Sequence, residues 1–142
     1  MFIAIVAGTS GCSRSSRAAV SGKVAMNGEP IASGDIAFVP VSLGQGAAGG
    51  APIERGQYDI RADQGLAPGD YKVAIHAFHR TGKKTWDGMG EPSAPASQKH
   101  YVEELEQYIP TKYNDATELK ATIVAGKVNR LSFDLRVSAG GK

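Results

Sequence analysis

The chain has 142 residues, of which 42% are hydrophobic, 21% charged and 7% aromatic, a size and composition typical of one compact domain. A single cysteine excludes an intrachain disulfide and any site that needs several thiolates, and a net charge of +2 is too small to indicate nucleic-acid binding. Eighteen glycines and seven prolines favour short strands joined by tight turns over a helical bundle.

The N-terminus combines a short apolar run with the single cysteine of the chain. The apolar run over residues 2–8 is too short to span a bilayer, and the small residues Thr-Ser-Gly separate it from Cys12. This arrangement is similar to the lipobox at which a lipoprotein signal peptidase cuts. We therefore expect residues 1–11 to be removed, Cys12 to carry the lipid anchor, and residues 12–17 to form a polar tether.

Two features of this segment depart from the lipoprotein pattern. No Lys or Arg precedes the apolar run, although a secretory signal normally begins with a basic segment, and Thr9 stands where the lipobox usually has an aliphatic residue. We therefore expect translation to start upstream of Met1. The alternative is that residues 2–8 form a first strand and that Cys12 is a spare thiol.

Alternation of apolar and polar residues predicts the strands that follow. They cover residues 20–26, 35–41, 52–54, 57–60, 70–78, 119–123 and 131–137. Asn27-Gly28 and Arg55-Gly56 are turn signals, and residues 42–51 read as a loop rich in Gly, Ala and Ser. In the strand at 70–78, Tyr71, Val73 and Ile75 are expected to face the core.

Between Arg80 and Thr117 the alternation stops, and residues 81–117 are predicted to be one long insertion. Tyr101, Leu105 and Tyr108 have the i, i+4, i+7 spacing of a helix face, and Glu103, Glu104 and Glu106 lie mostly on the other side. We therefore expect a short helix or turn between residues 97 and 108, packed across one end of the domain.

A family resemblance rests on the sequence Gly-Leu-Ala-Pro-Gly-Asp-Tyr-Lys-Val at residues 65–73 and on Val-Ser-Gly-Lys-Val at 20–24. Both resemble the carboxypeptidase regulatory-like, or transthyretin-like, domain. Ile-Pro-Thr-Lys-Tyr-Asn at 109–114 and Phe-Asp-Leu at 133–135 look like the small planctomycete-type bacterial lipoproteins that carry this domain.

The resemblance implies an all-β fold, an antiparallel Greek-key β-sandwich of about seven strands over residues 18–137, with a tail at 138–142. It also implies an accessory domain, because the regulatory domain of the carboxypeptidases contains no catalytic residues that could be assigned to this chain.

The residues themselves give little sign of catalysis or metal binding. His76 and His79 lie three positions apart on one strand and should face opposite sides, which is poor geometry for a shared metal. The three glutamates of residues 103–106 read as a solvated face rather than a catalytic pair. Asp59 and Asp63 lack the dense acidic loop of a calcium site. We predict no catalytic residue, no metal and no cofactor.

Four aromatic residues fall in or beside the predicted insertion: Trp86, Tyr101, Tyr108 and Tyr113. Aromatic faces on loops can stack on sugar rings, so Trp86 and Tyr101 are candidate ligand contacts. The alternative is that these rings fix the insertion to the core.

The function expected from these observations is a lipid-anchored, non-enzymatic structural or interaction module of the bacterial cell envelope. It would be attached to a membrane through Cys12, facing the periplasm or the cell surface, with an envelope protein or glycan as partner and without nucleic acid. The alternative is a carbohydrate- or peptide-binding module that uses the aromatic residues of the insertion 81–117.

Overall fold

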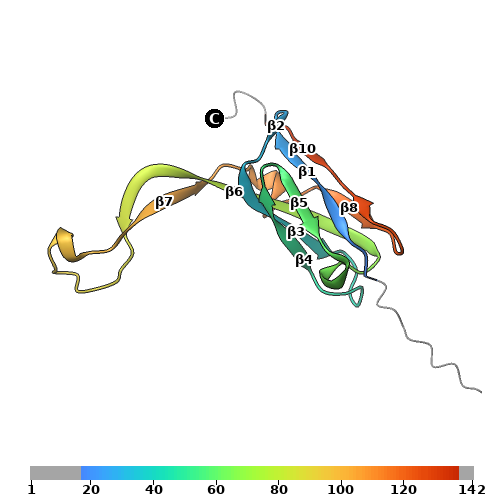
Figure 1. The fold of residues 1–142 in the computed structure, drawn as a ribbon, viewed down its shortest axis with the longest axis horizontal. Coiled ribbons are helices and arrows are strands. Elements are labelled where there is room, and N and C mark those ends of the chain that lie inside the picture. Colours follow the sequence, from blue (N-terminus) through green and yellow to red (C-terminus); the bar gives the residue numbers. More distant parts are fainter. Residues whose placement is uncertain (1–16, 138–142) are drawn as a thin grey trace, which may run out of the picture.

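The computed structural model describes residues 17–137, which form an all-β fold (Figure 1). The strands are β1 (Val20–Met26), β2 (Glu29–Pro30), β3 (Ser33–Pro40), β4 (Gly49–Glu54), β5 (Gln57–Ile60), β6 (Gly69–Trp86), β7 (Tyr101–Gln107), β8 (Lys120–Ile123), β9 (Asn129–Arg130) and β10 (Phe133–Leu135). The helical segments described are the short 3-10 turns η1 (Ala62–Gln64), η2 (Ala96–Gln98) and η3 (Thr111–Tyr113). The prediction of an all-β fold is confirmed.

All ten strands belong to one sheet, whose main path is β10-β1-β5-β4-β3-β6-β7. β2 and β9 also pair with β1, and β8 pairs with β6. The pairings are antiparallel except for those of β1 with β9 and with β10. Strands from distant positions on this path bury side chains in one core, including Val24 of β1, Phe38 of β3 and Leu135 of β10. The sheet therefore curves around a single hydrophobic centre.

The core follows the alternation read from the sequence. Tyr71, Val73 and Ile75 are fully buried, as predicted for the inward face of β6. Phe38 packs against Tyr58 and Tyr71 with ring centroids 6.1 and 6.3 Å apart. Aromatic pairs at such distances add to the free energy gained from burying the rings.

Both predicted turns are confirmed. Asn27 and Gly28 have φ values of 50° and 84°, and Arg55 and Gly56 have φ values of 51° and 75°. Two successive left-handed residues match the twist of a hairpin, which explains the glycine at the second position of each turn.

The loop predicted over residues 42–51 is partly wrong, because β4 already begins at Gly49. Gly50 lies opposite Ala37 in the ladder between β3 and β4. A Cβ at Gly50 would lie 2.4 Å from the carbonyl oxygen of Ile36, so glycine is required there by close packing of the backbones. Small residues look like a loop in the sequence, whereas here they permit a tight strand pairing.

The helix predicted between residues 97 and 108 is wrong, because residues 101–107 form strand β7. Trp86 lies opposite Tyr101 and Arg80 opposite Leu105 in its pairing with β6. An i, i+4 spacing places Tyr101 and Leu105 on one face of a strand as well as of a helix, because four is an even number of residues. Only Tyr108, at i+7, would have distinguished the two, and it lies beyond the strand.

The expectation that residues 97–108 pack across one end of the domain is also wrong. β6 continues eight residues past Phe78, and its second half pairs with β7 to form a two-stranded ribbon that curves away from the rest of the molecule (Figure 1). We call residues 78–107 the arm and the remainder the body. The arm does not cover an end of the body. It projects from it.

Candidate functional site

The arm is a ribbon with open edges. β6 pairs with β3 as far as Ala77, and from Phe78 onward it pairs with β7. Among the described strands, none pairs with the other edge of β6 over residues 78–86 or with the outer edge of β7. The register shifts between Arg80 and Lys84, which marks a bulge in the ribbon. Bulges of this kind bend a strand and increase its twist, in agreement with the curvature of the arm.

One face of the arm carries most of its exposed apolar side chains. Residues opposite each other in an antiparallel ladder lie on the same face, so the register places Phe78, Trp86, Tyr101 and Leu105 on one face of the arm, which they share with Arg80, Lys84 and Glu103. Phe78, Tyr101 and Leu105 are 46%, 42% and 59% exposed. A small protein usually buries such side chains, and their collection on a projecting element is typical of a contact surface.

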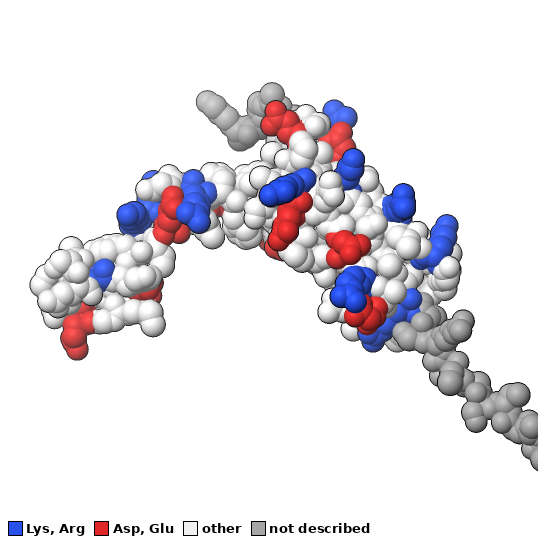
Figure 2. All heavy atoms as spheres, in the orientation of Figure 1, with Lys and Arg blue, Asp and Glu red and all other residues white. Residues whose placement is uncertain are grey.

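The charges of the arm are separated by strand. β6 contributes Arg80, Lys83 and Lys84, and β7 contributes Glu103, Glu104 and Glu106. Nη1 of Arg80 lies 3.2 Å from Oε2 of Glu103. Figure 2 shows these charges gathered over the middle of the arm, whereas the end of the arm is mostly uncharged.

Trp86 and Tyr101 close the ribbon at its far end. The backbone N–H of Asp87 donates to the carbonyl oxygen of His100, and Nε1 of Trp86 donates to the carbonyl oxygen of Met89 at 2.9 Å. The Nζ atom of Lys99 lies 5.1 Å from the centre of the Trp86 ring, within the range of a cation–π contact. We call the residues Trp86, Asp87, Lys99, His100 and Tyr101 the aromatic tip.

Asp87 organises the loop that follows. Its Oδ1 accepts a hydrogen bond from the backbone N–H of Met89 at 2.9 Å, and its Oδ2 lies 2.6 Å from Nδ1 of His100. These two contacts, first that with the Met89 N–H and second that with His100, hold the pKa of Asp87 below its usual value. The loop is thus fixed by hydrogen bonds where it leaves and re-enters the ribbon.

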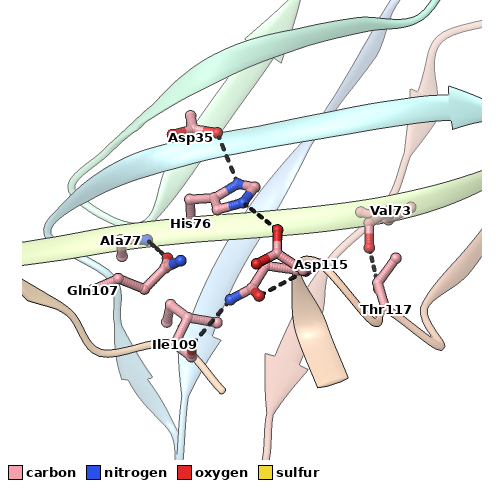
Figure 3. Close-up of polar contacts among 9 residues, drawn as sticks. Asp35, Val73, His76, Ala77, Gln107, Ile109, Asp115 and Thr117 are labelled. Atoms are coloured by element: carbon pink, nitrogen blue, oxygen red, sulfur yellow. Dashed lines mark hydrogen bonds and ion pairs between the residues drawn. The ribbon is translucent and has the colours of Figure 1, made fainter. Parts of the chain in front are cut away.

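A polar network fixes the root of the arm to the body (Figure 3). Oε1 of Gln107 accepts a hydrogen bond from the N–H of Ala77 at 3.2 Å, and the N–H of Tyr108 donates to the carbonyl oxygen of Ala77. Oγ1 of Thr117 donates to the carbonyl oxygen of Val73 at 2.5 Å. The segment between β7 and β8 is therefore tied to the edge of β6 at both of its ends.

The buried amide of Asn114 holds the middle of the same segment. Its Nδ2 donates to the carbonyl oxygen of Ile109 at 3.0 Å, and its Oδ1 accepts from the N–H of Asp115. Asp115 in turn lies beside His76, as Figure 3 shows: Nε2 of His76 is 3.9 Å from Oδ1 of Asp115, and its Nδ1 is 3.3 Å from Oδ2 of Asp35. Sequence reasoning missed this network, because its members come from three separate segments.

The histidines lie as their spacing predicted. His76 is on the outer face of β6, whereas His79 faces the other side, with Nε2 3.5 Å from Oε2 of Glu106 and its ring 5.6 Å from that of Tyr108. Within residues 17–137, no group of three or more His, Cys, Asp or Glu side chains has the arrangement of a metal site. Asp63 forms an ion pair with Arg61 at 3.4 Å.

The four aromatic residues singled out from the sequence divide into two pairs. Tyr108 and Tyr113 pack against the core, and the hydroxyl of Tyr113 donates to the carbonyl oxygen of Arg136 at 2.7 Å. Trp86 and Tyr101 lie at the end of the arm, opposite each other. The structure thus brings together the two residues that were predicted as ligand contacts.

Two other features bear on the site. A groove of about 660 Å³ runs over β1, β4 and β5 and is lined by charges of both signs, among them Lys23, Glu54, Asp59 and Arg130. It contains neither Trp86 nor any other residue of the arm. Cys12 and the expected signal 1–11 lie outside the described residues, and in the part of the chain from 17 to 137 no helix has the length and apolar character needed to cross a bilayer.

Comparison of the chain with family models, with curated proteins and with solved structures finds no match.

Proposed function

We propose that this protein is a lipid-anchored, non-enzymatic module of a bacterial cell envelope and that its arm is the element that contacts other envelope components. The observation that carries the proposal is the arm itself: a two-stranded ribbon whose apolar side chains Phe78, Tyr101 and Leu105 are exposed at its surface. Such a ribbon adds little to a core, and folding a chain segment into it has an entropic cost. Contact with a partner offsets that cost.

The sequence around Cys12 supports the lipid anchor, and the fold gives that anchor a direction. Ala18 forms a β-bridge with Leu66, and Leu66 lies three residues before β6 begins at Gly69. The N-terminal end of the described chain therefore lies near the start of β6. The arm is formed by the opposite end of β6. Since a strand rises about 3.3 Å per residue, the 18 residues of β6 span roughly 60 Å along their path. A membrane at the N-terminal end would therefore leave the arm pointing away from it.

We further propose that the body is the transthyretin-like β-sandwich that residues 65–73 resemble. The support is that Tyr71 and Val73 are buried just after Pro68 and Gly69, where β6 begins, and that β1, β3, β6 and β10 all contribute side chains to one core. A sandwich with a rigid core suits a display scaffold, because binding residues then lie on the elements that project from it.

The anchor is tested by intact mass spectrometry of the protein expressed in a bacterial host from its native gene, with Cys12→Ala as the comparison. Cleavage before Cys12 with added acyl mass in the wild type, and an uncleaved chain in Cys12→Ala, is the expected result. An unmodified wild-type chain would refute the anchor.

The contact role of the arm is tested with the double variant Phe78→Ser/Leu105→Ser, and Leu43→Ser is the matched control because Leu43 is fully exposed on the body. We expect the arm variant to keep the lipid but to be released from envelopes by a milder detergent wash than the control. Equal release of both variants would refute the contact role.

A further inference from the structure

We infer that the aromatic tip binds a neutral glycan, with Trp86 and Tyr101 as its stacking platform; this inference rests on the proposed contact role of the arm. A pyranose ring presents C–H bonds on its faces and hydroxyl groups around its rim. A site for it needs aromatic surface in the middle and hydrogen-bonding groups at the side.

The aromatic tip has that arrangement. Trp86 and Tyr101 are opposite each other in the ladder and share one face of the arm. Nζ of Lys99 lies over the indole of Trp86, 5.1 Å from the ring centre, whereas the imidazole of His100 is held by Asp87. The ammonium group of Lys99, close to the indole, is suited to donate hydrogen bonds to sugar hydroxyls.

Hydrogen bonds within the arm hold the side chains of the aromatic tip in place. The indole N–H of Trp86 is held by the carbonyl oxygen of Met89, and Asp87 bonds both to the Met89 N–H and to His100. A site whose side chains are fixed before binding loses less conformational entropy when the ligand arrives. This order is useful for a weak, stacking-dominated ligand such as a sugar.

Charge favours a neutral ligand over an anionic surface. The connecting loop over residues 87–100 has two acidic residues, Asp87 and Glu91, against one lysine, Lys99. Figure 2 shows the end of the arm to be mostly uncharged. A patch for anionic lipid headgroups would instead need a cluster of basic residues.

Size and edge charge favour a glycan over a protein partner at the tip. A stable protein interface buries about 800 Å² on each side, which is much more than two aromatic side chains offer. Strand addition to the arm would bring a partner against Lys83 and Lys84 on one edge or against Glu104 and Glu106 on the other. Charged residues on edge strands act against such pairing.

Trp86 is the only tryptophan of the chain, so its fluorescence reports on the tip directly. The full chain carrying Cys12→Ser is titrated with cellohexaose, chitohexaose, xylohexaose and mannohexaose, each to about 5 mM, where a dissociation constant of 1 mM gives clear saturation. We expect a saturable change in emission with at least one of these glycans. The same glycan should bind Tyr101→Ala about tenfold more weakly, corresponding to about 1.4 kcal/mol.

Leu43→Ala on the body is the control and should bind like the parent chain. Calorimetry with Trp86→Ala, which lacks the fluorescent reporter, should show the loss of binding independently. No saturable change with any of the four glycans, or equal affinity of Tyr101→Ala and the parent, would overturn the inference. If the detergent-release difference of the Phe78→Ser/Leu105→Ser variant persists in that case, the arm contacts a different partner and only the glycan assignment fails.

Discussion

Gln107 caps the N–H of Ala77 at the point where β6 passes from the body into the arm. Ala77 is the last residue of β6 that pairs with β3, and its N–H donates to Oε1 of Gln107 at 3.2 Å; the next residue, Phe78, is the first that pairs with β7. Ala77 is fully buried, so its N–H has no access to water. The side chain of Gln107 thus provides the acceptor at this junction, whereas elsewhere along β6 a backbone carbonyl of the neighbouring strand provides it.

Gln107→Leu should lower the free energy of unfolding by about 1–3 kcal/mol, because it leaves the buried N–H of Ala77 without an acceptor. Gln107→Glu keeps an oxygen in the same place and should cost clearly less at neutral pH. Urea unfolding of the three chains makes the comparison. Equal losses for Leu and Glu would show that the hydrogen bond is not what stabilises the junction.

Gly22→Ala should destabilise the body severely. An added Cβ would lie 1.7 Å from the carbonyl oxygen of Leu131 and 3.1 Å from the ring of Tyr58, whose hydroxyl donates to that same oxygen at 2.7 Å. Overpacking typically costs about 1–3 kcal/mol, and a backbone contact leaves little room for relief. Ser21→Ala on the neighbouring position is the control. A loss below about 0.5 kcal/mol in Gly22→Ala, the range of ordinary surface changes, would contradict the packing described.

The exposed face of the arm should be nearly neutral for stability. Phe78→Ser and Leu105→Ser remove side chains that are about half exposed, and each should change the free energy of unfolding by about 0.5 kcal/mol or less. Ile75→Ala, three residues before Phe78 on β6 and fully buried, should cost about 2–5 kcal/mol. Thermal or urea unfolding separates the two cases. A core-sized loss at Leu105 would mean that the arm packs onto the body in solution.

The order of the aromatic tip should be lost in acid. The pKa of Asp87 is lowered in the folded state, so its contacts stabilise the tip fully above the unfolded pKa of about 4 and are lost as the pH falls through the lowered folded-state value. Emission of Trp86 should therefore change below about pH 4. Asp87→Asn should lack this transition, whereas Glu91→Gln in the same loop should retain it. An acid transition that persists in Asp87→Asn would assign it to another group.

The body could be predicted from the sequence because period-two alternation is decisive where one face is buried. Val73 and Ile75 are apolar and their neighbours Lys72 and His76 are polar, so the strand and its orientation were both evident. The arm carries no such signal. Both of its faces are exposed, and Leu105 and Glu103 are therefore not separated by burial as core and surface residues are.

The candidate site was predicted in part. Trp86 and Tyr101 were identified by residue type alone, yet their proximity follows only from the β6–β7 register, which the helical interpretation of residues 97–108 concealed. The network around His76 and Asn114 had no sequence signal, since Asp35 and Asp115 both reach His76 only because β3 and the segment after β7 flank the same strand. Pairings over 40 to 80 residues of sequence depend on the whole fold.

Site-specific photo-crosslinking in intact cells tests the central claim most directly. A benzophenone side chain replaces Met89 beside the aromatic tip, or Arg61 on the body as the control, in the full chain with and without Cys12→Ala. The account predicts membrane-associated adducts from position 89, few from position 61, and loss of the adducts from position 89 when Cys12 is replaced. Equal adduct yields from positions 89 and 61, or yields that do not depend on Cys12, would contradict it.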